Sequence, residues 1–443
     1  MAQTAAGAAS GACRAAAGPT LNDMSASRTA ATSLSTSAAP APARLTVTTR
    51  PVDDPGDLLA RLPGPQALTW LRGVDGLVAW GEVARLEVSG PDRFAEASRW
   101  WEQQVARFDV VDDVEVPGSG PVAFASFTFD EGPSTSVVVV PEVVVGRRDG
   151  AAWVTRVGEA DAAPQVAPVV EPGPVAYSDG QLTPGGYERA VAAGVARIRS
   201  GELEKVVLAR DLVASSEQPV DPRALLRRLA ERYPSCWTYS VDGLVGATPE
   251  LLVRRTGDHV VSRVLAGTIG RSTDAVVDAQ HAAELLRSDK DRREHELAVR
   301  SVAETLAPYC ADLVVPRTPE IVRLANVQHL QTDVTGRLGN GETALDLAGA
   351  LHPTAAVCGT PTGAARVAIR ELEGFDRGRY AGPVGWVDAR GDGAFGIALR
   401  CARIEGTRVV MYAGAGIVEG SVPSDELAET QDKLVAVRDA LGS

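Results

Sequence analysis

The chain has 443 residues, of which 57 are acidic and 44 are Lys or Arg, so its formal net charge is −13. This acidity disfavours nucleic acid or an anionic membrane surface as the main partner, because both are bound through basic surfaces. Five widely spaced cysteines without a CxxC pair favour the cytoplasm, and no apolar run approaches the roughly 18 residues that a transmembrane helix needs.

The first half of the chain predicts a sheet with few helices. Residues 1–43 are rich in Ala, Ser, Thr and Pro, and we expect a disordered tail there because large apolar side chains are almost absent. Residues 44–175 alternate Val-rich runs, such as 136–145, with turn residues, and one amphipathic helix is expected near 93–108. A Pro-rich linker at 160–180 follows, which need not separate independent domains.

The second half, residues 176–443, begins with a clear helix start, because Thr183 can act as N-cap and Pro184 can occupy the first helical position. Many strands with interspersed helices, and no regular β–α–β alternation, predict an α+β, mainly antiparallel layered fold. Strands are predicted at 205–213, 237–245, 251–254, 259–265, 394–403 and 408–411, and helices at 222–232, 275–307, 344–351 and 426–441.

Two acidic motifs lie on predicted helices. Asp291 and Glu294 are spaced i, i+3, as are Glu426 and Glu429, so each pair shares one helix face. Two such faces could build a site for Mg²⁺, a cation that carboxylates and substrate oxygens commonly hold together. The alternative is that these are solvated helix faces and that Lys433 is merely the i+4 salt-bridge partner of Glu429.

Lys205 and Glu250 are candidate proton-transfer groups. Lys205 opens a strand that is apolar on both faces, and desolvation lowers the pKa of a lysine so that its amine can act as a base. Glu250 follows a proline and precedes an apolar strand, a setting that raises the pKa of a carboxyl group and suits a general acid. Taken alone, a lysine at the start of a strand is usually a surface residue, and an isolated turn glutamate is more often structural than catalytic.

Two glycine-bearing segments, at 265–268 and 412–418, could present backbone N–H groups to an anion, although tight turns and β-bulges need glycine too. Arg400 ends a predicted strand and could bind a carboxylate with two hydrogen bonds. His329 is by default a satisfied core histidine.

Taken in order, these segments resemble the chorismate-utilising enzyme family, which includes isochorismate, salicylate, anthranilate and aminodeoxychorismate synthases. The resemblance is strong from about Tyr187 to Leu441 and weaker before it. It implies the fold of anthranilate synthase component I, with two stacked, mainly antiparallel β-sheets flanked by helices and a site between them. The matching segments are KVVLAR, TPELLVR, LAGTIGR, DKDRREHELAV, VQHLQTDV, LHPTAAVCGTP, ELEGFDRGRYAGPVGW, ALRCARI, YAGAGIV and ELAETQDKL.

The resemblance also implies a role for each candidate residue. Glu294 and Glu429 would ligate Mg²⁺, supported by Asp291 and Glu426. Lys205 and Glu250 would face opposite sides of the chorismate ring as base and acid. The substrate-binding residues would be Ala266, Gly267, Thr268, His329, Tyr380, Arg400, Gly414, Gly416 and Lys433.

Three features resemble isochorismate synthases in particular. Lys205 stands where aminating members carry glutamine, Ala266 stands where aminodeoxychorismate synthases carry a lysine nucleophile, and HPTAAVCGTPTGAA replaces an SGAPK-type loop. The resemblance therefore implies Mg²⁺-dependent, reversible conversion of chorismate to isochorismate by water attack at ring carbon 2, in a monomer without an amidotransferase subunit. Menaquinone and catechol siderophore synthesis both use this reaction.

Two alternatives stay open at this point. Tyr380 occupies a position where salicylate synthases have tyrosine, so isochorismate formation could be followed by pyruvate elimination. A catalytically inert chorismate-binding protein could share the fold, although such a protein would be expected to lack Lys205, Glu250 or a metal-binding glutamate, and none is missing here.

Overall fold

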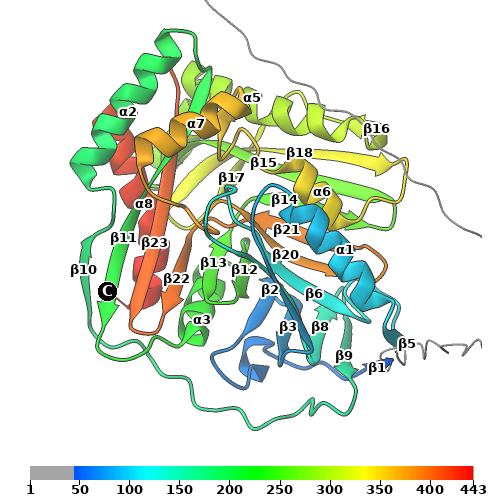
Figure 1. Cartoon of the computed structure of the whole chain (residues 1–443). Coiled ribbons are helices and arrows are strands. Elements are labelled where there is room, and N and C mark those ends of the chain that lie inside the picture. The colour runs from blue at the N-terminus through cyan, green and yellow to red at the C-terminus, as the bar shows by residue number, and fades with distance from the viewer. Residues whose placement is uncertain (1–43, 443) are drawn as a thin grey trace, which may run out of the picture. The chain divides into compact units, whose positions relative to one another are not determined.

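Two β-sheets and eight α-helices make up residues 44–442, the part of the chain that the computed structural model describes (Figure 1). Every strand pairing there is antiparallel except that between β1 (Leu45–Pro51) and β5 (Phe108–Asp112). The predicted mainly antiparallel α+β architecture is therefore confirmed. The tail predicted at residues 1–43 lies outside the described residues.

The larger sheet combines strands from both halves of the sequence. Strand β12 pairs with β2 so that Tyr239 lies opposite Trp70, which joins the halves in one layer. In spatial order its strands are β10 (Val175–Asp179), β11 (Lys205–Ser216), β23 (Arg408–Ile417), β22 (Cys401–Glu405), β13 (Leu244–Thr248), β12 (Trp237–Val241), β2 (Leu68–Arg72), β3 (Asp75–Trp80), β8 (Val143–Arg148), β9 (Ala151–Val157), β1 and β5, with β19 (Gly359–Thr360) paired to β11.

The smaller sheet mixes the two halves in the same way, because β20 pairs with β6. In spatial order its strands are β16 (Cys310–Val314), β18 (Val327–Leu338), β15 (His259–Gly270), β14 (Leu251–Thr256), β21 (Gly393–Ile397), β20 (Pro383–Asp388), β6 (Val122–Ser126), β7 (Ser136–Val140) and β4 (Ala84–Val88), with β17 (Glu320–Arg323) beside β18. Strands from before and after the 160–180 linker thus share both sheets.

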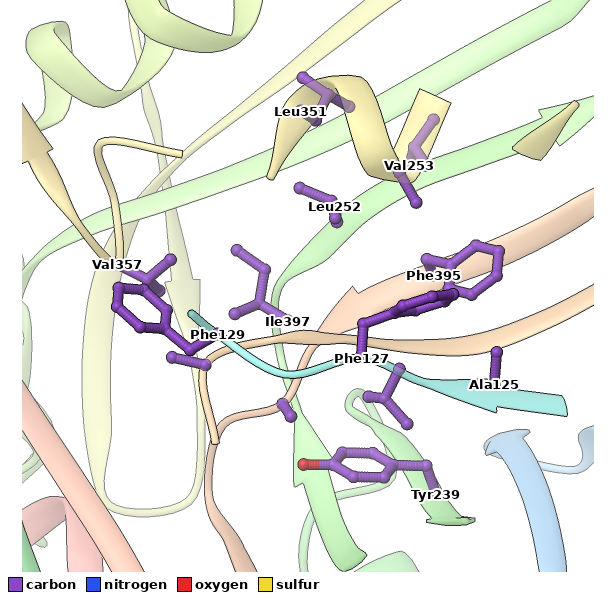
Figure 2. Packing of buried hydrophobic residues seen from close by; sticks show 14 of the residues in the cluster. Ala125, Phe127, Phe129, Tyr239, Leu252, Val253, Leu351, Val357, Phe395 and Ile397 are labelled. Carbon is purple, nitrogen blue, oxygen red and sulfur yellow. The ribbon is translucent and has the colours of Figure 1, made fainter. Parts of the chain in front are cut away.

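The main apolar core lies between the sheets (Figure 2). Phe395 on β21 and Val253 on β14 pack there with Phe127, and all three side chains are fully buried. From the larger sheet, the buried Tyr239 joins this core, and its hydroxyl donates to the Leu399 carbonyl at 3.2 Å. The hydroxyl of this aromatic ring is therefore satisfied inside an apolar layer.

The outer face of the larger sheet carries a second apolar cluster. Side chains alternate between the two faces of a strand, so Val144 joins the inter-sheet core while its neighbours Val143 and Val145 join the outer cluster. Helices α2 (Pro184–Arg199), α3 (Pro222–Arg232), α7 (Thr362–Glu373) and α8 (Pro423–Leu441) pack against this sheet, whereas α4 (Ala275–Arg287), α5 (Asp289–Leu306) and α6 (Ala344–Leu351) pack against the smaller one and α1 (Arg93–Val105) packs against α6.

The helix start predicted at Thr183 and Pro184 is confirmed. Thr183 Oγ1 accepts a hydrogen bond from the Gly186 N–H, with Pro184 in the first turn. Thr343 and Asp346 form a complete capping box at the start of α6.

Among the described residues, no helix combines the length and the apolar character that crossing a bilayer requires.

The structure divides three predicted elements and adds several that were not predicted, among them the strands β16 to β20. The helix predicted at 275–307 is two helices, because Ser288 is extended and its hydroxyl caps α5 by accepting from the Asp291 N–H. The strand predicted at 237–245 is a hairpin that turns at Asp242 and Gly243, both with positive φ. The strand predicted at 394–403 breaks between Ile397 and Cys401, and helix α7 was not predicted.

Candidate active site

A pocket at the end of the inter-sheet core gathers residues from distant parts of the chain. Glycines and polar side chains from β15, β18, β23, α5 and α8 meet there. Of the predicted site residues, those that line it are Glu250, Ala266, Gly267, Thr268, Glu294, His329, Tyr380, Arg400, Gly414, Gly416 and Lys433. The other four, Lys205, Asp291, Glu426 and Glu429, adjoin this set through the contacts described below.

Lys205 lies at the start of β11 with its side chain fully buried. Its Nζ lies 3.2 Å from Glu294 Oε1 on α5, so the predicted base contacts a predicted metal ligand. Gly416 on the neighbouring strand leaves room for this pair, since a Cβ there would lie 2.2 Å from Glu294 Oε1 and 3.1 Å from Lys205 Cε. The ion pair thus explains why glycine occupies position 416.

Glu250 lies in the turn between β13 and β14, where Thr248 Oγ1 accepts a hydrogen bond from its backbone N–H at 3.2 Å. Burial raises the pKa of the Glu250 carboxyl from 4.5 to about 8, and the positive charge of Lys205 and the Leu265 N–H offset only part of this shift. The expectation of a raised pKa is confirmed. Glu250 therefore carries a proton at neutral pH and can donate it.

His329, Thr268 and Arg400 form a short hydrogen-bonded chain along one wall of the pocket. Burial holds the pKa of His329 well below 6.5, and the nearby Arg400 and Lys433 lower it further, so the ring is neutral. An arginine can only donate, so Arg400 Nη2 donates to His329 Nε2 at 3.3 Å. The proton of the ring then lies on Nδ1, which donates to Thr268 Oγ1 at 3.0 Å.

Arg400 takes its place through an unusual backbone conformation. It lies in the segment between β21 and β22, with φ of 49°, in the left-handed region that non-glycine residues rarely adopt. Backbone strain of this kind is common at functional sites, where the surrounding structure holds it. The conformation places the guanidinium against His329 in the pocket wall.

Tyr380 and Tyr412 stack face to face beside the pocket, with ring centroids 5.1 Å apart and planes inclined by 13°. Burial raises the pKa of Tyr380, so its hydroxyl stays protonated. Gly414 leaves space for that hydroxyl, because a Cβ at this position would come within 3.2 Å of it.

The predicted acidic faces lie on α5 and α8. Burial raises the pKa of Asp291, and repulsion from Glu294 and Glu429 raises it further, while burial and then Glu429 raise that of Glu426. Among residues 44–442, no three Asp, Glu, His or Cys side chains are close enough to form a ready-made metal site. Mg²⁺ usually keeps several waters and takes one or two carboxylates plus substrate oxygens, so mutually repelling carboxylates still fit this cation.

Two lysines neutralise part of this charge. Lys290 Nζ donates to Glu426 Oε1 at 2.7 Å. Lys433 Nζ lies 2.5 Å from Glu429 Oε1 and donates to the Gly414 carbonyl at 2.9 Å. The i, i+4 contact of Glu429 with Lys433, considered as the alternative from the sequence, is thus present, and Lys433 also reaches the pocket.

Sequence reasoning missed Arg377 and Glu373. Their side chains form a buried ion pair, and Arg377 also lines the pocket. Arg377 donates to the carbonyls of Val207 and Val357, and Glu373 accepts from the Ala209 N–H, so the pair ties β11 to the loop before β19. The four-residue Glu–Arg spacing was the available signal, but Arg377 lies beyond the last residue of α7, Glu373, so helix periodicity does not predict this pair.

Comparison with known proteins agrees with this geometry. The model of the family described as chorismate binding enzyme matches residues 72–442. The chain belongs to this family. It is 45% identical over 271 residues to isochorismate synthase DhbC of Bacillus subtilis, covering 58% of this chain and 68% of DhbC. It is 42% identical over 340 residues to MenF of Mycobacterium tuberculosis, covering 73% of this chain and 87% of that protein.

Solved structures show the same fold. The menaquinone-specific isochorismate synthase MenF of Escherichia coli matches with a TM-score of 0.75 and 26% identity, over 90% of this chain and 94% of that one. Anthranilate synthase component I of Streptococcus pneumoniae matches with a TM-score of 0.67 at 22% identity, over 83% of this chain and 92% of that one. The predicted anthranilate synthase component I-like fold is confirmed.

Proposed function

We propose that this chain is a Mg²⁺-dependent isochorismate synthase, which reversibly converts chorismate to isochorismate. The observation that carries the proposal is one pocket, in a member of this family, that brings together a protonated, buried Glu250 and the buried Lys205. The relatives named as isochorismate synthases support the choice of reaction.

The two residues would move protons on opposite sides of the substrate ring. Lys205, an ammonium in its resting ion pair with Glu294, would act once it has released that proton to solvent. Its free amine takes a proton from the water that attacks ring carbon 2, and Glu250 gives its proton to the hydroxyl that leaves carbon 4 as water. Transfer of a proton back from Lys205 to Glu250 restores the starting state. One water enters and one leaves, so substrate and product differ only in the position of one hydroxyl and the reaction runs both ways.

The enolpyruvyl carboxylate would be held at the wall built by Arg400 and Lys433, with the backbone at Gly414 and Gly416. The neutral ring of His329 accepts from Arg400, so it orients that guanidinium without competing for the anion. Ala266, Gly267, Thr268 and Tyr380 would complete the lining.

The Mg²⁺ ion would be held by Glu294 and Glu429, with Asp291 and Glu426 in support. It would supply the positive charge that binds the ring carboxylate, which the acidic groups of α5 and α8 cannot supply themselves. The enzyme would act as a cytoplasmic monomer without an amidotransferase subunit. Its product would enter menaquinone or catechol siderophore synthesis; one relative is named as menaquinone-specific and another as vibriobactin-specific.

Amination and covalent catalysis are disfavoured by residues in the pocket. Ala266 offers no nucleophile, and Lys205 is suited to activating water. Salicylate formation remains the second candidate because Tyr380 lines the pocket.

The direct test is incubation of the purified protein with chorismate, with Mg²⁺ or with excess EDTA, followed by chromatography. Isochorismate should form with Mg²⁺ and stop forming with EDTA, and added Mg²⁺ should restore it. Equal turnover in EDTA would contradict the metal assignment, and no isochorismate under any condition would contradict the proposed reaction.

A further inference from the structure

A second and larger cleft is separate from the candidate active site. Its volume is about 970 Å³, and it shares no lining residue with the catalytic pocket. Its walls combine the β2–β3 turn and the end of β8 in the larger sheet with β14 and β15 in the smaller one. Nothing in the proposed isochorismate reaction uses this cleft.

Three guanidinium groups line the cleft, those of Arg72, Arg148 and Arg254. Arg72 donates to the Ser235 carbonyl at 2.9 Å and forms no ion pair with a carboxylate of the described residues 44–442. Neither Arg148 nor Arg254 forms a hydrogen bond or an ion pair with any residue in the range 44–442, whereas most arginines in that range do. A chain with a net charge of −13 thus concentrates unpaired positive charge in one hollow.

Aromatic rings hold some of these cations in place. Arg72 lies over the Trp237 ring at 4.5 Å from its centroid, and Arg263 lies over the same ring at 5.6 Å. Trp70 stacks on Trp237 with centroids 6.3 Å apart. Arg148 lies over Trp386 at 5.5 Å. Cation–π contacts orient a guanidinium but leave its N–H donors free for a ligand.

The acidic residues of the cleft do not neutralise it. Asp75 approaches Arg147, at 3.9 Å, and Asp149 forms no ion pair with the described residues although it follows Arg148 in the chain. Asp333 forms an ion pair with Arg263 at 2.8 Å. The donors of Arg148 and Arg254 therefore remain available.

The guanidiniums are close enough to repel one another. Burial lowers the pKa of Arg254, and Arg263 lowers it further; burial and then Arg254 act in the same way on Arg148. Asp149 offsets part of this repulsion without forming an ion pair with either arginine in the described residues, and an anion placed among the guanidiniums would relieve the rest.

We propose that this cleft binds a small multivalent anion, a molecule with two or more carboxylate or phosphate groups, through Arg72, Arg148 and Arg254. Guanidinium forks match the planar geometry of carboxylates and the oxygen spacing of phosphates, and three of them spread over the walls of a cleft of about 970 Å³ suit a ligand with more than one anionic group.

The test uses the full chain in metal-free buffer, titrated separately with citrate and with inorganic tripolyphosphate, and followed by calorimetry and by tryptophan fluorescence. Trp70 and Trp237 line the cleft and report occupancy. At least one of the two anions should bind saturably at one site per chain. The tighter of the two assigns carboxylate or phosphate as the preferred group.

The Arg148→Gln/Arg254→Gln variant should bind that anion roughly tenfold or more weakly, because it loses charge-assisted hydrogen bonds. The matched control is Arg99→Gln/Arg156→Gln, which removes the same charge from exposed positions outside the cleft and should bind like the wild type. Both variants should turn over chorismate at the wild-type rate, which shows that they fold. Absence of saturable binding by either anion, or equal affinity in the cleft variant, would overturn the proposal.

Discussion

Lys205 Nζ and Glu294 Oε1 lie 3.2 Å apart at the edge of the pocket, on elements nearly ninety residues apart in sequence. The lysine is fully buried and the glutamate nearly so, with 13% of its side chain exposed. A buried charge that loses its partner is strongly destabilising. The contact therefore connects the metal site, the proton-transfer group and the stability of the fold.

The first prediction follows from this contact. Glu294→Ala and Glu429→Ala should each abolish turnover, but Glu294→Ala should also lower the free energy of unfolding by about 3 kcal/mol, because it strands the Lys205 ammonium. Glu429→Ala should lower the free energy of unfolding less, because its partner Lys433 still donates a hydrogen bond to the Gly414 carbonyl. Denaturant unfolding measures both, and Lys205→Met/Glu294→Ala should recover part of the loss. Equal stability of the two single variants would contradict this account.

Gly416→Ala should cost both activity and stability. Its methyl group would lie 2.2 Å from Glu294 Oε1, so the carboxylate must leave Lys205. Gly420→Ala is the matched control, because no heavy atom lies within 4 Å of the added carbon. Initial rates and melting temperatures of the two variants decide the matter. Equal initial rates and equal melting temperatures in the two alanine variants would show that the close packing at position 416 affects neither activity nor stability.

Lys205→Ala and Glu250→Gln should each lower kcat by roughly 10²-fold or more, the usual effect of removing a positioned proton-transfer group. KM for chorismate should change less, because Arg400 and the metal ion supply most of the anion binding. Steady-state kinetics separates the two constants. A Lys205→Ala enzyme with a raised KM and an unchanged kcat would make this lysine a binding residue.

The pH dependence of activity should report Glu250. Its carboxyl must be protonated to act as an acid, so the rate should fall as the pH rises through about 8, the pKa of this group. The residual rate of Glu250→Gln should lack that fall. Initial rates between about pH 6 and pH 10 test this, and an identical alkaline limb in both enzymes would assign the titration to another group.

The same group links stability to pH. Its folded-state pKa of about 8 lies above the ordinary 4.5, so the folded protein binds more protons than the unfolded chain between these values. The stability that Glu250 contributes is full below pH 4.5 and is lost as the pH rises through 8. Unfolding curves at about pH 5 and about pH 9 should show Glu250→Gln gaining stability relative to the wild type. A difference that does not vary with pH would contradict the buried, protonated state.

Local features of this fold were predictable from the sequence because local chemistry determines them. Thr183 and Pro184 mark the start of α2 both in the sequence-based prediction and in the structure. The hairpin turn at Asp242 and Gly243 was missed although an Asp-Gly pair between two apolar runs is a strong signal for a two-residue hairpin turn. The break at Ser288 was missed because the residues on both sides of it fit one helical pattern. The serine hydroxyl, which can cap a new helix, was the local signal for the break.

The candidate active site also has features that the sequence predicts and features that depend on the tertiary structure. Glu250 was recognisable from its proline turn and apolar strand, which predict burial. The contact of Lys205 with Glu294 and the arginine cleft depend on how separate strands and helices come together, so no spacing in the sequence predicts them. The Glu373–Arg377 pair was not recognised in the sequence, because only the packing of α7 against β11 buries it.

The central claim is that one pocket moves a hydroxyl and leaves the enolpyruvyl group attached, and product analysis tests it most directly. Purified protein, chorismate and Mg²⁺ should give isochorismate, detected by chromatography, at a rate that ammonia and glutamine do not change. A lactate dehydrogenase readout should detect no pyruvate above background, and isochorismate supplied as substrate should return chorismate. Salicylate and pyruvate appearing together as the main products would contradict the account and assign the deciding role to Tyr380.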